Sequence, residues 1–312
     1  MTSLLPHGLS EVLNWNIQKR CPRDCVDGPT FSDGDQAPRF RAGNCSAEEL
    51  EPFTGVLSGF VANCEADLLV GWRSMPISPN NPFKGRQHPG ELIILCVRLY
   101  LRYPLSDEHV AELVAELGVE VDASCIWRWV QAYAPELNKR CRPYLNPVNK
   151  SYRIGETYIK VKGEEKYLYR ALDSTGQTID FLLTAKRDMV VAKRFLRKAI
   201  DASGNAVPRV MNVDKNPAYP AAVEALKAEG AISRRVALHQ CKYLNNVIEQ
   251  DHRAVKTRVW LAKGYGSFHA AWRTLQGIET VHMIRKGRVK WLAKGDAVGQ
   301  ALFIDWLFGL AA

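Results

Sequence analysis

Residues 210–217 read VMNVDKNP, a short apolar run that ends at an aspartate and is followed by a proline. The run predicts a buried strand, because short apolar runs bounded by turn signals are typical of sheet cores. The proline cannot continue a ladder of backbone hydrogen bonds, and the pattern from Tyr219 to Glu229, closed by Gly230, predicts a helix. Asp214 is therefore expected at the carboxyl end of a central strand, where open α/β sheets bind their ligands.

A second carboxylate, Glu249, follows Asp214 with 34 residues between them, one turn into a helix that is predicted to open at Asn245 and Asn246. Alone, an aspartate after a strand is usually a cap or turn residue, and a glutamate on a polar helix is usually solvated. Together, one carboxylate at a strand end and one on a nearby helix are the hard oxygen ligands of a divalent-metal site for phosphoryl transfer.

Three blocks of the sequence carry a more specific pattern. They read GETYIKVKG at 155–163, NVDKNPAYP at 212–220 and YLNNVIEQDHR at 243–253. These blocks strongly resemble the DDE transposases of bacterial insertion-sequence family six. Two shorter blocks, NPFKGR at 81–86 and TLQG at 274–277, look like the same family.

The resemblance implies a ribonuclease-H-like catalytic domain behind a helix-turn-helix, with a carboxylate triad that binds two Mg²⁺ or Mn²⁺ ions. Asp214 and Glu249 match two members of that triad. The implied partners are double-stranded DNA, both the terminal inverted repeats of the element and the target, and further copies of the chain in a homodimer or higher assembly. The resemblance favours a copying route through a fused intermediate.

The chain departs from the family at the first carboxylate, where the family has aspartate and this sequence has Gly155. Glu156 is no simple substitute, because successive side chains of a strand point to opposite faces. A glycine-centred bulge that re-aims Glu156 is one alternative. Asp173 is a second possible donor, although it is expected to belong to the hairpin turn at 173–176. The sequence thus predicts two of three carboxylates and a weakened or absent activity.

The composition predicts a soluble globular chain of two domains with an additional N-terminal segment, since 46% of its 312 residues are apolar. No apolar run approaches membrane-spanning length and the N-terminus lacks a signal-peptide pattern, so the expected location is cytoplasmic. The resemblance further implies a nucleoid-associated protein of a bacterium or archaeon. The eight scattered cysteines form no zinc motif, and reduced thiols are expected.

Charge separates the first segment from the rest. Residues 1–74 hold six Lys and Arg against ten Asp and Glu, whereas residues 75–312 hold 36 against 23. Because Met75 stands just ahead of the block at 81–86, we interpret residues 1–74 as an acidic, loop-rich extension ahead of a native start at Met75. A genuine accessory segment is the alternative.

Residues 75–134 are predicted to form a helix-turn-helix domain with helices at 90–103, 107–117 and 123–133. Three side chains of the third helix are spaced to pack inward: Ile126, Trp127 and Val130. The opposite face then carries Ser124, Arg128 and Gln131. This spacing is typical of a motif whose last helix enters the DNA major groove, and an ordinary three-helix packing unit is the alternative.

Residues 135–150 resemble a basic linker, and residues 151–312 are assigned to the catalytic domain with basic C-terminal helices. The predicted order is strands at 151–161, 166–172 and 178–184, a helix at 189–202, a strand at 207–213, a helix at 219–229, a strand at 236–240 and the Glu249 helix. Three strands, and then helices that alternate with single strands, is the order of a ribonuclease-H-like α/β sheet.

Basic residues continue along the Glu249 helix. Arg253 and Lys256 lie four and seven residues beyond Glu249, on the same face, where they can hold DNA phosphates. A solvated basic face is the alternative. Residues 250–312 carry ten basic and four acidic residues, a composition that suits contact with the DNA backbone.

The sequence therefore predicts a DNA transposase that binds terminal inverted repeats and catalyses metal-dependent strand cleavage and transfer, with an activity impaired by Gly155. A catalytically inactive DNA-binding protein or transposition repressor is the second hypothesis, and a general nuclease on the same fold is the third. A strand-transfer assay on repeat-ended DNA separates them.

Overall fold

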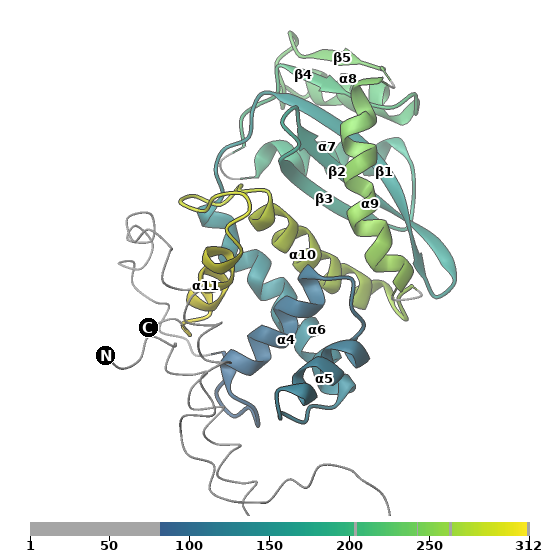
Figure 1. The fold of residues 1–312 in the computed structure, drawn as a ribbon. Coiled ribbons are helices and arrows are strands. Elements are labelled where there is room, and N and C mark those ends of the chain that lie inside the picture. Colours follow the sequence, from purple (N-terminus) through teal and green to yellow (C-terminus); the bar gives the residue numbers. More distant parts are fainter. Residues whose placement is uncertain (1–81, 203–204, 242, 262–263, 311–312) are drawn as a thin grey trace, which may run out of the picture. The chain divides into compact units, whose positions relative to one another are not determined.

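A computed structural model describes residues 82–202, 205–241, 243–261 and 264–310 (Figure 1). The predicted extension at 1–74 lies outside the described residues. The helices of the described part are α4 (Gly90–Arg102), α5 (Asp107–Glu116), α6 (Ala123–Cys141), α7 (Met189–Asp201), α8 (Ala218–Ala228), α9 (Asn246–Leu261), α10 (Phe268–Arg285) and α11 (Ala297–Leu307), with short 3₁₀ turns η3 (Arg142–Tyr144) and η4 (Tyr243–Asn245). None of these helices is long and apolar enough to cross a membrane.

The strands form one five-stranded mixed sheet in the order β3-β2-β1-β4-β5. Their bounds are β1 (Ser151–Val161), β2 (Glu164–Asp173), β3 (Thr178–Thr184), β4 (Val210–Asn212) and β5 (Ala237–His239). The first three strands are antiparallel neighbours, and β4 and β5 run parallel to β1. This is the ribonuclease-H-like α/β fold that the order of elements predicted. The strand predicted at 207–213 is shorter than expected.

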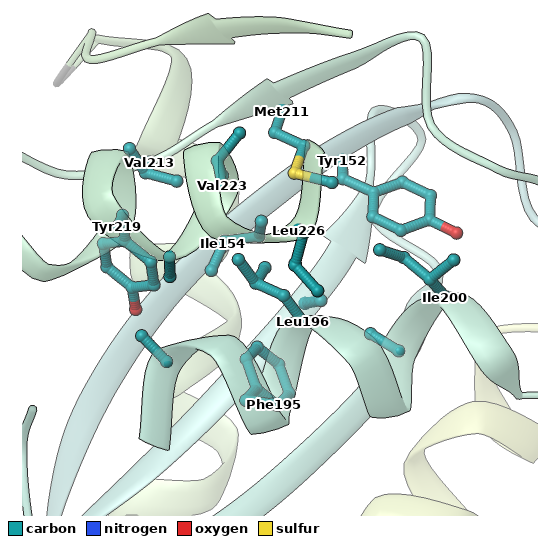
Figure 2. Packing of buried hydrophobic residues seen from close by; sticks show 14 of the residues in the cluster. Tyr152, Ile154, Phe195, Leu196, Ile200, Met211, Val213, Tyr219, Val223 and Leu226 are labelled. Atoms are coloured by element: carbon teal, nitrogen blue, oxygen red, sulfur yellow. The ribbon is translucent and has the colours of Figure 1, made fainter. Parts of the chain in front are cut away.

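Two layers of helices cover the sheet. On one face, α7 and α8 bury the core cluster of Figure 2, in which Phe195 and Leu226 meet Ile154 and Met211 of the central strands. On the other face, α9 contacts β1 and β2, and α10 contacts β3 (Figure 1). Each side chain of β1 therefore faces one of two different helical layers, and alternation along the strand decides which.

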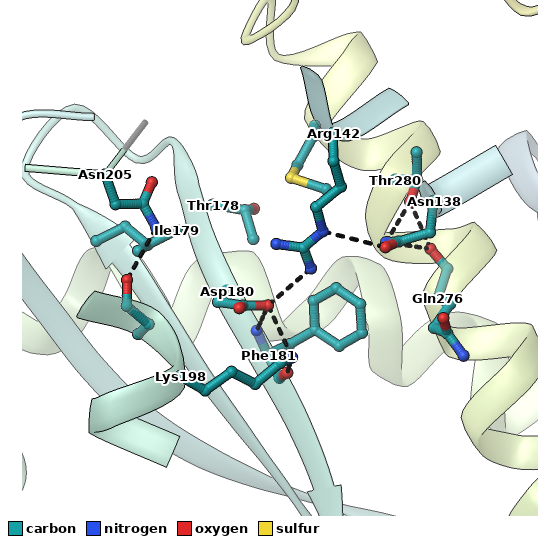
Figure 3. Close-up of polar contacts among 12 residues, drawn as sticks. Asn138, Arg142, Thr178, Ile179, Asp180, Phe181, Lys198, Asn205, Gln276 and Thr280 are labelled. Atoms are coloured by element: carbon teal, nitrogen blue, oxygen red, sulfur yellow. Dashed lines mark hydrogen bonds and ion pairs between the residues drawn. The ribbon is translucent and has the colours of Figure 1, made fainter. Parts of the chain in front are cut away.

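The helix α6 does not end at Tyr133, as predicted, but continues through Pro135 to Cys141. The first half of the predicted linker is therefore helical. Directly after it, Arg142 donates to Asp180 of β3 at 3.0 Å and to the Asn138 side chain at 3.2 Å (Figure 3). This part of the chain is anchored to the sheet, because its polar side chains find buried partners there.

The C-terminal helices pack on the N-terminal ones. Gln131 and Asn138 of α6 donate to Thr274 and Thr280 of α10, each at 2.8 Å, and α11 contacts α4 and α6. A Cβ atom at Gly277 of α10 would lie 2.6 Å from side chains of α4 and α6, so that glycine allows the three helices to approach closely. The helical part of the molecule thus combines segments from both ends of the described chain.

Two side chains of α6 lie on the opposite face from the one predicted. Trp127 is 47% exposed, and Trp129 occupies the inward position instead. Gln131, predicted on the DNA-facing surface, is buried against Thr274. The reason is that α6 has two sets of partners, α4 and α5 on one side and α10 on the other. The helical periodicity of the sequence predicted buried side chains on only one face of α6.

Candidate active site

Asp214 lies two residues beyond the end of β4, at the edge of the sheet where the parallel strands finish. In the parallel register Arg153 pairs with Asn212, which is the last pair of the β1–β4 ladder, and Asp214 follows two residues later. One carboxylate oxygen of Asp214 accepts from the Asn216 backbone N–H at 3.0 Å. Asp214 is half-buried, at the place that the sequence predicted.

Glu249 lies in the first turn of α9, and its side chain is 64% exposed. Two residues further along α9, Asp251 forms an ion pair with Arg170 of β2 at 2.7 Å. The flank of α9 that carries Asp251 therefore faces β2. Residues two apart on a helix are separated by roughly 200°. Glu249 therefore projects from a different flank of α9 than Asp251 does.

Gly155 lies in β1, and its backbone faces α9. A Cβ atom built on it would lie 3.3 Å from two carbons of the Ile248 side chain and 3.5 Å from the His252 ring. Both residues belong to the turn of α9 that carries Glu249. A side chain at position 155 would consequently point toward α9, and Gly155 supplies no oxygen donor there.

His252 is buried directly against this glycine position. Its side chain is 1% exposed, and Nδ1 lies 3.8 Å from a Glu249 carboxylate oxygen. Neither ring nitrogen has a hydrogen-bond partner among the described residues. Burial, together with the charge of Arg170, lowers the pKa of His252 to about 3. The ring is therefore neutral at physiological pH.

Glu156 occupies the opposite face of β1, as strand alternation predicted. Its side chain is 4% exposed, forms an ion pair with Arg187 and accepts from the Asn216 amide at 3.1 Å. Burial and the nearby Glu156 carboxylate raise the pKa of Tyr169 and that of Tyr219. Glu156 thus belongs to a polar cluster beneath α7 and α8, and no bulge at Gly155 turns it toward α9, since the β1–β2 register is continuous there.

Asp173 closes the hairpin between β2 and β3. One of its carboxylate oxygens accepts from the Thr175 N–H at 2.9 Å, the Thr175 hydroxyl at 2.6 Å and the Gln177 N–H at 2.9 Å. The other accepts from the Asn149 N–H at 3.2 Å. The side chain is 2% exposed. The prediction that Asp173 serves the turn is therefore confirmed, and its oxygens are committed there.

A buried ion network holds α9 on the sheet. Arg170, which is fully buried, pairs with Glu279 of α10 at 2.6 Å as well as with Asp251. Asp251 also pairs with His282 at 2.8 Å and Lys286 at 2.6 Å. Although burial opposes ionisation, the hydrogen bond from His282 and the charge of Arg170 hold the pKa of Asp251 well below its usual range. The network links β2, α9 and α10, so it fixes the helix that carries Glu249.

Two buried asparagines next to the site were not singled out by the sequence analysis. Asn212, the last residue of β4, donates its amide to the Asn245 side chain, and Asn245 donates to the Ile154 carbonyl at 3.3 Å. Both are less than 5% exposed. The signal in the sequence was the polar residue inside the apolar run VMNV, because a buried amide in a strand requires partners.

The donor set fits a hard divalent cation only in part. Asp214 and Glu249 are carboxylates, the ligands that Mg²⁺ and Mn²⁺ prefer, and each has an oxygen that accepts no hydrogen bond from the described residues. The described residues contain no group of three or more His, Cys, Asp or Glu side chains that could hold a metal ion. Asp214 and Glu249 correspond to two of the three donors that the sequence analysis expected, and Gly155 stands where the third was expected.

The residues predicted to contact DNA divide between surface and core. Ser124 and Arg128 are exposed on α6, where Arg128 donates to the Ser124 hydroxyl at 3.1 Å. Arg253 and Lys256 are exposed on α9 and make no ion pair within the described ranges. Gln131 is buried and therefore not available to DNA.

The chain is similar to several known proteins. A family model described as a DDE domain matches residues 149–288. The transposase for the insertion sequence-like element IS431mec of Staphylococcus aureus is 38% identical over 207 residues, which are 66% of this chain and 89% of that protein. The transposase for the insertion sequence element IS257 in transposon Tn4003, also of Staphylococcus aureus, matches to the same extent. Among solved structures, the HTLV-2 integrase catalytic core domain in complex with magnesium has a TM-score of 0.36 and 14% identity, over 46% of this chain and 94% of that chain.

Proposed function

Since the chain belongs to the DDE transposases of insertion-sequence family six, we propose that it binds the terminal inverted repeats of its element and that its strand cleavage and transfer are impaired by Gly155. The observation that carries this proposal is that position 155 has no side chain and faces Ile248 and His252, in the turn of α9 that bears Glu249. Neither neighbouring carboxylate compensates, because Glu156 and Asp173 are committed to other partners.

The residues would divide the work between holding DNA and holding a cation. Arg253 and Lys256 lie on the same helix as Glu249 and would pair with phosphates beside the scissile bond. Arg128, with Ser124, would contact DNA from the start of α6 in the manner of a helix-turn-helix. Asp214 and Glu249 would hold a divalent cation, Mg²⁺ or Mn²⁺, which supplies Lewis-acid stabilisation of the phosphate when bound.

The reaction of this class consists of two phosphoryl transfers. Water first attacks a phosphodiester at the end of the element and frees a 3′ hydroxyl. That hydroxyl then attacks a phosphodiester of the target DNA, so that one ester bond forms as another breaks and no covalent intermediate with the protein is needed. We propose that the chain acts in a homodimer or higher assembly on DNA, because two element ends must be joined to one target.

A strand-transfer assay on repeat-ended DNA with Mg²⁺ tests the proposal. We expect the unmodified chain to be weakly active and Gly155→Asp to raise the rate by about 100-fold, the magnitude typical of restoring one preorganised electrostatic group. Gly155→Ala supplies the same Cβ atom without a carboxylate and should remain weak. A fully active unmodified chain would show that another residue provides the missing oxygen.

The second candidate function is a non-catalytic DNA-binding protein or transposition repressor that occupies element ends. The commitment of Glu156 and Asp173 to other partners favours it, because it leaves the triad without a replacement donor. On this alternative, the chain binds repeat-ended DNA in a mobility-shift assay, and Gly155→Asp gains no strand transfer. Repeat-specific binding without rescue would therefore select the repressor.

A further inference from the structure

We propose that Asn212 and Asn245, here called the asparagine pair, are positioning residues. They would keep the backbone segments that carry Asp214 and Glu249 in place relative to position 155. The inference rests on the proposed function in one respect, the assignment of these two carboxylates as cation ligands. It assigns a role to two neutral side chains that would not touch the cation or the DNA.

The pair connects the three elements that build the site. Asn212 ends β4 two residues before Asp214, and Asn245 immediately precedes α9, four residues before Glu249. The amide of Asn245 donates to the carbonyl of Ile154, the residue before Gly155. Each of the three positions 155, 214 and 249 is therefore close in sequence to a residue that these hydrogen bonds hold. Gly155 and Asp214 are one and two residues away from such a residue, and Glu249 is about one helical turn away.

Burial and hydrogen bonding indicate that the pair is not present for core stability alone. Asn212 is fully shielded from solvent, and its amide also donates to the Cys241 carbonyl at 3.0 Å. Its side-chain oxygen, however, has no hydrogen-bond partner in the described part of the chain. A buried polar atom without a partner destabilises a fold, and an apolar residue would fit the end of this strand without that penalty.

The position of Asn245 leads to the same conclusion. An asparagine just before a helix normally accepts from a backbone N–H of the first turn and so caps the helix. Here its side-chain oxygen accepts from Asn212, and no bond from the backbone of α9 to that oxygen occurs among the described residues. Asn245 thus connects α9 to the sheet. Side chains that orient metal ligands through such contacts typically change metal affinity by about 10- to 100-fold when they are removed.

The experiment measures Mn²⁺ binding by electron paramagnetic resonance on the full chain. Asn212→Ala and Asn245→Ala should each weaken binding by about tenfold, and the double variant should be no weaker than either single variant, because either change breaks the same connection. Asn246→Ala is the matched control, since Asn246 is exposed and one position away. It should bind Mn²⁺ like the unmodified chain.

A second readout separates positioning from general destabilisation. In a Glu249→Gln background, Asn245→Ala should have no further effect on Mn²⁺ affinity, whereas a purely structural defect would weaken binding there too. Asn212→Val is a second variant that should keep the strand folded, because valine is suited to a buried strand. It should weaken Mn²⁺ binding as much as Asn212→Ala does. Hydrogen exchange should increase at the first turn of α9 in the Asn212 variants, whether or not a cation binds.

The two proposals can fail separately. If Asp214→Asn and Glu249→Gln leave Mn²⁺ binding unchanged, the assignment of the ligands is wrong. If those variants weaken binding but Asn212→Ala and Asn245→Ala do not, the positioning role is overturned while the proposed function stands. Additive effects of the two asparagine changes would likewise overturn the pair as a unit.

Discussion

At the scale of the residue, Gly155 shows how alternation along a strand assigns each side chain to one helical layer. Its neighbours on β1 alternate between the two helical layers, so Glu156 faces α7 and α8 while position 155 faces α9. A carboxylate one position along the strand is therefore no substitute for the missing one. Asp214 and Glu249, the two carboxylates that the sequence predicted as ligands, each keep an oxygen that accepts no hydrogen bond from the described residues.

We expect Gly155→Asp to lower the melting temperature in the absence of divalent cations and Mg²⁺ to raise it again. A third carboxylate near Asp214 and Glu249 is repelled until a cation neutralises it. Ligand binding to the folded state alone stabilises by about 2.7 kcal/mol at a hundredfold excess over the dissociation constant. Thermal unfolding with and without Mg²⁺ measures this. Gly155→Ala should show no comparable Mg²⁺ effect, and an equal effect in both variants would contradict the expectation.

At the scale of the element, α6 shows how two sets of partners divide the faces of one helix. Ile126 and Val130 pack inward as predicted, Trp127 is exposed, and Gln131 faces α10. The exposed arc at the start of α6 therefore carries Ser124, Trp127 and Arg128 rather than the predicted set. A contact with DNA from this helix has to use that arc.

We expect Arg128→Ala to weaken binding to repeat-ended DNA and to reduce the slope of log K against log salt by about one, as for the loss of one phosphate contact. Gln131→Ala should leave both quantities unchanged. It should instead lower the free energy of unfolding by about 1 kcal/mol, because the Thr274 hydroxyl loses its buried partner. Fluorescence anisotropy over a salt series and urea unfolding provide the measurements. A reduced salt slope for Gln131→Ala would show that this face meets DNA after all.

The close approach of α10 to α4 and α6 gives a second prediction for the element scale. Gly277→Ala would place a methyl group 2.6 Å from Ala134 and Leu101 side chains, and overpacking of this kind costs about 1–3 kcal/mol. Gly266→Ala is the control, because a Cβ atom there meets nothing within 4 Å. Urea unfolding of both variants tests the contrast. Equal stabilities would mean that the helices can separate without penalty.

At the scale of the whole molecule, the helical part and the sheet are connected through α10. This helix packs on α6 and α4 and also contributes Glu279, His282 and Lys286 to the ion network on the sheet. The helix that carries Glu249 is thereby linked to the helices proposed to bind DNA. The described residues of 82–134 and of 151–310 are consequently not independent in their packing, although the sequence analysis assigned them to two domains.

We expect the chain to lose cooperative unfolding when it is cut at the predicted boundary. A fragment of residues 82–150 would expose the faces of α4 and α6 that α10 covers, and a fragment of residues 151–312 would expose the matching face of α10. Circular dichroism during thermal unfolding should show a cooperative transition for the full chain and broad transitions for the fragments. A cooperative transition in the 82–150 fragment would establish an autonomous domain.

The sequence by itself determined the order and type of the elements and the positions of Asp214 and Glu249. Local pattern is sufficient for these, because a strand period of two, a helix period near 3.6 and the turn chemistry of Pro217 or Asp173 act between near neighbours. The same reasoning correctly separated Glu156 from the site, since alternation along a strand is a local property.

Only the tertiary structure decided which elements cover each face of the sheet and each face of α6. The burial of Gln131, the continuation of α6 into the predicted linker and the asparagine pair all depend on partners more than 30 residues away in sequence, such as Thr274 for Gln131 and Asn245 for Asn212. A periodic pattern shows that a side chain is buried, but the identity of its partner follows from long-range packing of the whole chain. For that reason the sequence predicted where Asp214 and Glu249 lie along the chain, and the structure showed the long-range hydrogen bonds that join β4, β1 and the start of α9.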